Sequence, residues 1–174
     1  MAATDFSGFN NVLGSLTLGG YDTSKYEPHG LTWTLDPAND RDLVVQLQSI
    51  TSGTTSLLPE AIPVFLDSTV PYLYLPAAAC ALFETAFGLI WDNETQLYLL
   101  TEAQHASLRS KNPSITFSIG SFASTTRVSI VFPYAAFDLT VTYPHVENAT
   151  QYFPLKRATN VEQFTLGRTF FQEA

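Results

Sequence analysis

Short runs in which apolar and polar residues alternate, separated by glycine or proline, are the feature that most constrains the fold of this chain. Residues 31–35 (LTWTL) and 115–119 (ITFSI) alternate without interruption. An apolar residue at every second position predicts a strand with one buried face. Less regular runs predict further strands at residues 16–18, 43–50, 128–132 and 137–141. Glycine and proline residues between the runs predict turns.

Two segments break this alternation and predict short helices. The first runs from Pro76 to Phe87, because proline suits the start of a helix and Gly88 follows at the position where helices commonly end. The second begins with Thr101 and Gln104, which have the spacing of a capping box, and ends before Lys111. The sequence therefore predicts one domain that is mainly β, with two short helices.

Composition excludes several classes of protein. Of the 174 residues, 45% are hydrophobic and only 14% are charged, which favours a large apolar core over intrinsic disorder. The formal net charge is −8, and the longest basic run is the pair Lys156-Arg157, so we expect no nucleic-acid partner. No run of about 18 apolar residues occurs, so we expect no membrane span.

Metal and disulfide chemistry are not indicated. The three histidines have no metal-ligand spacing and Cys80 is the only cysteine, so we expect no metal site, no cofactor and no intrachain disulfide. Cys80 falls in the apolar predicted helix, which is typical of a buried thiol. Asn93 and Asn148 begin N-glycosylation sequons. Together with the acidic, lysine-poor composition, they favour a secreted glycoprotein, although the polar residues 1–11 lack the basic and apolar regions expected of a signal peptide.

Asp67 is the candidate catalytic residue. It directly follows the apolar residues Val64, Phe65 and Leu66, in what should be a buried strand. From residue type alone, an aspartate that ends a strand and binds local backbone groups is the commoner situation. The pattern around Asp67 changes that assessment.

The segment around Asp67 resembles the second active-site motif of pepsin-like aspartic proteases, in which apolar residues precede Asp-Thr/Ser-Gly-Thr/Ser. Three further stretches resemble the carboxy-terminal lobe of that family in the same order: residues 14–22, 113–117 and 164–171. Residues 131–138 and 152–157, which lie between the last two of these, look like secreted fungal members of the family. The resemblance implies a mainly β fold, one lobe of the bilobal pepsin-like fold, with antiparallel sheets and two short helices. We expect residues 1–174 to form this single lobe, with the amino-terminal lobe and the final strands absent.

The resemblance also implies roles for individual residues. Family members hydrolyse peptide bonds with water activated between two aspartates, one from each lobe. By this resemblance, Asp67 is one of the two aspartates, and Ser68 supplies a hydroxyl that bonds across the lobe interface. Leu166 and Gly167 would form the strand that braces the loop carrying Asp67.

Three departures from the family pattern bear on activity. Thr69 stands where the family has glycine, and we expect its side chain to crowd the carboxylate and the substrate. Val70 stands where the family has a hydroxyl that binds the aspartate, so we expect Asp67 to be less well oriented. The chain contains one such motif, because Asp5 lacks the preceding apolar run.

Three functions are compatible with these features. The first is a protease half that binds a peptide or protein substrate together with an amino-terminal lobe and is inactive alone. The second is a degenerate lobe that binds peptides or proteins without cutting them, which Thr69 and Val70 favour. The third is a homodimeric protease, formed through open sheet edges, in which each copy gives Asp67.

Overall fold

The computed structural model describes residues 18–20, 22–25, 43–122 and 126–172, and the structural statements below concern these residues. The chain divides into two compact units, Met1–Thr32 and Trp33–Ala174. The described part of the first unit contains the short 3-10 helix η1 (Thr23–Lys25), where the Ser24 hydroxyl donates to Asp22 Oδ1 at 2.7 Å. The strand expected at residues 31–35 and most of the segment 14–22 lie outside the described residues.

The larger sheet of the second unit has eight strands. Its order is β11-β4-β12-β3-β1-β7-β8, with β2 paired to β1. Neighbouring strands are antiparallel, except that β11 runs parallel to β4 and β12 runs parallel to β3. The sheet is therefore mixed, but most of its strand pairs are antiparallel, as expected for the mainly antiparallel β fold that the resemblance implies. The strands are β1 (Val44–Ser52), β2 (Thr55–Ser56), β3 (Ile62–Leu66), β4 (Leu73–Leu75), β7 (Ile115–Gly120), β8 (Arg127–Phe132), β11 (Leu155–Arg157) and β12 (Thr165–Leu166).

The smaller sheet has four antiparallel strands in the order β5-β6-β10-β9. Its strands are three or four residues long: β5 (Ile90–Asp92), β6 (Leu97–Leu99), β9 (Leu139–Val141) and β10 (Thr150–Phe153). The predicted strand at residues 137–141 corresponds to β9, but Phe137 belongs to the preceding 3-10 helix η2 (Tyr134–Phe137). The other three strands are too short to give an alternation that can be recognised in the sequence.

Both predicted helices are present. The first, α1 (Ala77–Phe87), follows Pro76 and ends at Gly88, whose φ of 69° is in the left-handed region that favours glycine. The second, α2 (Glu102–Lys111), begins with a capping box formed by Thr101 and Gln104. A third helix that the sequence did not predict, α3 (Arg168–Phe171), has only four residues and follows a 3-10 helix, η3 (Val161–Gln163), and β12. No helix in the described part of the chain is long and apolar enough to cross a bilayer.

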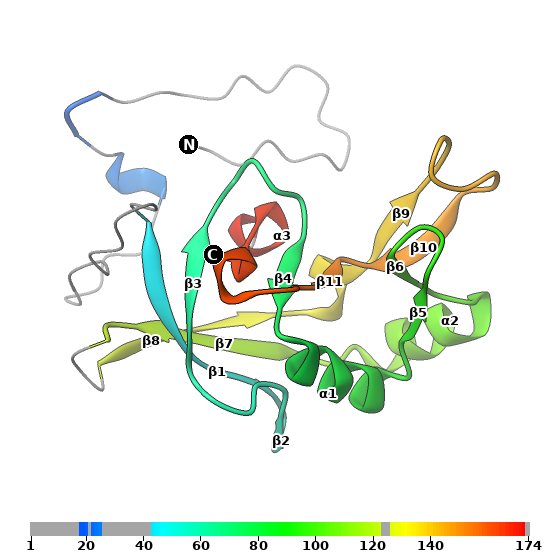
Figure 1. Cartoon of the computed structure of the whole chain (residues 1–174), viewed down its shortest axis with the longest axis horizontal. Coiled ribbons are helices and arrows are strands. Elements are labelled where there is room, and N and C mark those ends of the chain that lie inside the picture. The colour runs from blue at the N-terminus through cyan, green and yellow to red at the C-terminus, as the bar shows by residue number, and fades with distance from the viewer. Residues whose placement is uncertain (1–17, 21, 26–42, 123–125, 173–174) are drawn as a thin grey trace. The chain divides into compact units, whose positions relative to one another are not determined.

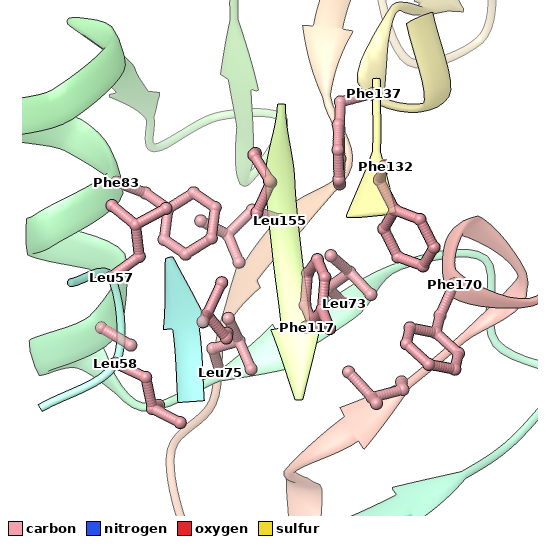
Figure 2. Close-up of a cluster of buried hydrophobic side chains, with 14 of the residues drawn as sticks. Leu57, Leu58, Leu73, Leu75, Phe83, Phe117, Phe132, Phe137, Leu155 and Phe170 are labelled. Atoms are coloured by element: carbon pink, nitrogen blue, oxygen red, sulfur yellow. The ribbon is translucent and has the colours of Figure 1, made fainter. Parts of the chain in front are cut away.

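Buried aromatic and aliphatic side chains join the elements into one core (Figure 2). The rings of Phe137 and Phe153 stack with centroids 5.0 Å apart. On α3, the ring of Phe170 meets those of Phe132 at 5.3 Å and Phe117 at 5.8 Å. Phe170 is 2% exposed, and burial of such a ring stabilises the fold by about 1.5–3 kcal/mol. This packing fixes the start of α3 against the rest of the unit, and with it the segment that approaches Asp67.

Candidate active-site loop

Asp67 lies on the loop between β3 and β4, directly after the last residue of β3. Strand β12 lies between these two strands, with Leu166 opposite Leu66 on β3 and opposite Leu73 on β4. The backbone N–H of Asp67 donates to the carbonyl oxygen of Leu166 at 3.2 Å. The structure therefore brings together Asp67 and Leu166, two residues that are far apart in the sequence.

The start of α3 holds the far side of the same loop. The backbone N–H of Arg168 donates to the carbonyl of Val70 at 2.7 Å. The hydroxyl of Thr169, which is buried, donates to the carbonyl of Pro71 at 2.8 Å. Figure 1 shows α3 next to the loop that joins β3 to β4. Because α3 is itself fixed by Phe170, these two bonds connect the loop to the hydrophobic core.

Gly167 fits this site because it has no side chain. Its N–H donates to the carbonyl of Tyr72 at 3.1 Å. A Cβ atom at this position would lie 2.3 Å from the carbonyl oxygens of both Val70 and Tyr72. Its φ of −89° is ordinary, so the requirement for glycine comes from close backbone approach and not from backbone conformation. Leu166 and Gly167 thus lie against the loop at the place that the resemblance implies.

Thr69 binds the Asp67 carboxylate twice. Its backbone N–H donates to Asp67 Oδ1 at 2.8 Å, and its hydroxyl donates to the same oxygen at 2.7 Å. Thr69 is exposed, and positive φ among the described non-glycine residues occurs only at Gln96 and Asn112. A threonine is therefore accommodated here without left-handed backbone. The Thr69 side chain meets the carboxylate through a hydrogen bond, and the expected crowding of the substrate stays a prediction.

The remaining residues of the loop complete a tight turn. Ser68 is half-buried, and the N–H of Val70 donates to the carbonyl of Asp67 at 3.3 Å. The aliphatic side chain of Val70 supplies no hydroxyl to the Asp67 carboxylate. The Thr69 hydroxyl donates to Asp67 Oδ1 instead, and the expectation that Val70 leaves Asp67 less well oriented stays a prediction. This donor was missed from the sequence, although an aspartate followed two residues later by threonine is a pattern that favours local side-chain bonds.

Tyrosines continue the loop into the neighbouring strands. The ring of Tyr72 lies 6.3 Å from the rings of both Tyr74 and Tyr152. Burial raises the pKa of Tyr72 and raises that of Tyr152 to about 12, with the Arg168 charge opposing both shifts. The ammonium of Lys156 lies 4.8 Å from the centre of the Tyr72 ring, and burial lowers the pKa of Lys156. The phenols of Tyr72 and Tyr152 therefore remain protonated at acid and neutral pH, so they can donate hydrogen bonds but carry no charge.

The other candidate residues lie away from the loop. The Cys80 thiol is buried on α1, 3.6 Å from the carbonyl of Lys156, and burial raises its pKa to about 12. Asn93 is exposed in the turn between β5 and β6, and Asn148 is exposed in the connection between β9 and β10. The described residues contain no group of three or more His, Cys, Asp or Glu that could hold a metal ion.

Comparison with known proteins identifies the family. A family model described as "Eukaryotic aspartyl protease" matches residues 4–174. Among the solved structures, the crystal structure of aspartic proteinase from Irpex lacteus matches with a TM-score of 0.61 and 22% sequence identity. The match covers 88% of this chain and 45% of that one, so this chain spans less than half the length of that protein.

A search of curated proteins finds no match. At 22% identity, the likeness to the Irpex lacteus proteinase shows the fold alone. The family model covers nearly the whole chain and is independent of that likeness. The chain therefore belongs to the eukaryotic aspartyl protease family.

Proposed function

We propose that this chain is the carboxy-terminal lobe of a secreted aspartic-endopeptidase-like protein and contributes Asp67 as one of two catalytic carboxylates. The observation that carries the proposal is the fixed position of Asp67. Its backbone is bonded to Leu166 at 3.2 Å, and its carboxylate is bonded by Thr69 at 2.7 and 2.8 Å. A group prepared for catalysis has to be held in this way before substrate binds.

Two carboxylates are needed because they perform opposite tasks. One must be ionised to take a proton from water, while the other must be protonated to polarise the scissile carbonyl. Two carboxylates placed close together share one proton, since both cannot ionise at once. Within the described residues, the side-chain hydrogen bonds of Asp67 go to Thr69 and not to a second carboxylate. We therefore propose that the monomeric chain is inactive and that the second carboxylate and part of the substrate site come from an amino-terminal lobe.

Reconstitution tests this proposal. The chain is refolded with the amino-terminal lobe of a family member, assembly is verified by sedimentation, and hydrolysis of a quenched-fluorescence peptide is followed at acid pH. We expect turnover from the assembled pair that disappears in Asp67→Asn. Asp92→Asn is the matched control, because Asp92 also accepts a threonine hydroxyl, from Thr95 at 2.6 Å, but lies at the β5–β6 turn. Equal turnover by assembled Asp67→Asn and wild-type chains would contradict the proposal.

A second candidate function is a lobe that binds a peptide or protein without cutting it. The replacement of the family glycine by Thr69 and of the family hydroxyl by Val70 favours this function. Anisotropy of a fluorescent peptide would then increase on addition of the chain alone. No turnover would appear after assembly with an amino-terminal lobe.

A third candidate function is a homodimeric protease in which each copy supplies Asp67. Strands β8 and β11 end the larger sheet on its two sides, and an edge strand can pair with another chain. The oligomeric state, measured together with activity, separates this function from the first two.

A further inference from the structure

We infer that Thr69 is the positioning residue for Asp67 and that its hydroxyl, bonded to Oδ1, holds the carboxylate in one orientation. The inference rests on the proposed function and deepens it. Thr69 acts through Asp67, because its hydrogen bonds go to the carboxylate.

Two donors from one residue meet at one oxygen of Asp67. The hydroxyl bond of 2.7 Å has the length typical of an O–H donor on oxygen, and the N–H bond of 2.8 Å is short for its type. Bonds to an ionised acceptor are stronger than neutral ones. Because the backbone of Asp67 is fixed by Leu166, the remaining freedom lies in its two side-chain torsions. The two bonds from Thr69 restrict both torsions.

The hydroxyl is the part of Thr69 that matters. Any residue at this position, including glycine, would present the backbone N–H. Threonine adds the second donor, whereas the side chain of Val70, the next residue, contains no hydrogen-bond donor. Thr69 is exposed, so its methyl group does not pack in the hydrophobic core. Replacement of Thr69 should therefore leave the core intact. The loop thus obtains a hydroxyl on the aspartate from position 69.

The arrangement distinguishes the two oxygens of the carboxylate. Both bonds from Thr69 end on Oδ1. No described residue donates a hydrogen bond to Oδ2.

The test measures the side-chain torsion of Asp67 in the isolated chain by NMR. Three-bond couplings from Asp67 Cγ to the backbone nitrogen and carbonyl carbon report how χ1 is populated. We expect couplings of a single rotamer in the wild type and in Thr69→Ser, which keeps the hydroxyl. In Thr69→Val, which keeps the shape and the N–H, we expect averaged couplings, with the rotamer ratio shifted about tenfold by loss of one charge-assisted bond.

A double replacement adds a rescue test. Thr69→Gly should average the couplings as Thr69→Val does, and adding Val70→Thr should restore a single rotamer if a hydroxyl at position 70 can replace that of Thr69. Unchanged amide spectra outside the loop show that each variant is folded. A single rotamer in Thr69→Val, or averaged couplings in the wild type, would overturn the inference.

The outcome is independent of the proposed reaction. The couplings are measured without substrate or second lobe, so an inactive assembly would count against the proposed function and leave the positioning result standing. In an active assembly, we expect Thr69→Val to lower kcat with little change in KM and Thr69→Ser to retain both. A higher KM with unchanged kcat in Thr69→Val would overturn the positioning role.

Discussion

The N–H of Gly167 donates to the carbonyl oxygen of Tyr72 at 3.1 Å, and the same oxygen lies 2.3 Å from the place where a Cβ atom on Gly167 would sit. The bond and the close approach have one cause: β12 and the start of α3 pass directly against the loop that carries Asp67. Any side chain at position 167 would push the two segments apart. The position of Asp67 therefore depends on the absence of a side chain at a residue remote from it in the sequence.

The first prediction follows from this contact. Gly167→Ala should destabilise the chain by about 3 kcal/mol or more, since the atoms in the way are backbone carbonyls that cannot rotate aside. Thermal or urea unfolding measures the loss. The matched control is Gly53→Ala, at a φ of 56° with open space around it, which should cost only about 1–2 kcal/mol of backbone strain. Equal losses in the two variants would contradict the close approach at Gly167.

Acid sensitivity is predicted for a network that joins α1, β6 and β11. Tyr98 donates to Glu84 Oε1 at 2.6 Å, and Arg157 donates to the same oxygen at 2.8 Å. Burial raises the pKa of Glu84, but the bonds from Tyr98 and Arg157 outweigh burial, and the pKa is lowered from its ordinary value. Because the pKa of Glu84 is lower in the folded than in the unfolded chain, the ionised carboxylate stabilises the fold at pH values above the unfolded pKa of about 4.3. This stabilisation is lost as the pH falls through the pKa of the folded state.

Glu84→Gln should therefore reduce stability by about 1 kcal/mol at pH 6. It should also flatten the decline in the free energy of unfolding between about pH 5 and pH 3. Urea unfolding across that range measures both effects. The control is Glu60→Gln, because Glu60 is exposed at the turn before β3. If Glu84→Gln shows the same pH dependence as the wild type, the network does not carry the acid sensitivity.

Cys80 should be unreactive while the chain is folded. Burial raises the pKa of its thiol to about 12, so the reactive thiolate is absent at ordinary pH. Native protein mixed with a thiol reagent at pH 8 should remain unlabelled, and the same protein in denaturant should be labelled fully. Rapid labelling of the native form would show that α1 opens or that the thiol is not buried.

Glycosylation is predicted at two exposed asparagines if the chain passes through a eukaryotic secretory pathway. Asn93 and Asn148 are both exposed, in connections between short strands, with threonine two residues later. Enzymatic deglycosylation should increase the electrophoretic mobility of the secreted chain, and Asn93→Gln and Asn148→Gln should each remove part of that change. Asn112→Gln is the control, because Pro113 excludes modification there. An unchanged mobility would count against secretion as a glycoprotein.

The parts of the fold that follow local rules could be predicted from the sequence. Both longer helices have recognisable ends: Gly88 takes the left-handed conformation after α1, and Thr101 with Gln104 caps α2. Strand β7 contains the alternating residues 115–119 that predicted it and extends one residue further, to Gly120. The parallel pairs of the larger sheet and the three- or four-residue strands depend on distant partners, such as Leu166 opposite Leu66, and leave no local pattern.

The residues of the candidate site also divide into those that the local sequence predicts and those that it does not. Asp67 and Gly167 were identified because the sequence around each resembles a family motif. The side chain of Thr69 was expected to crowd Asp67, although an aspartate followed two residues later by threonine favours the local hydrogen bond that the structure contains. The network of Glu84, Tyr98 and Arg157 could not be predicted, because three separate elements have to pack before its members meet.

Peptide hydrolysis by the chain alone tests most directly the central claim that Asp67 is one half of a pair of carboxylates. The assay follows a quenched-fluorescence peptide between pH 3 and pH 6, with sedimentation to give the monomer and dimer fractions and Asp67→Asn as the control. We predict no turnover by the monomer, because each general acid or base contributes roughly 10²–10⁴-fold and one carboxylate cannot serve as both on the same carbonyl. Turnover that rises with the dimer fraction and disappears in Asp67→Asn would favour the homodimeric protease. Turnover by a confirmed monomer would contradict the account.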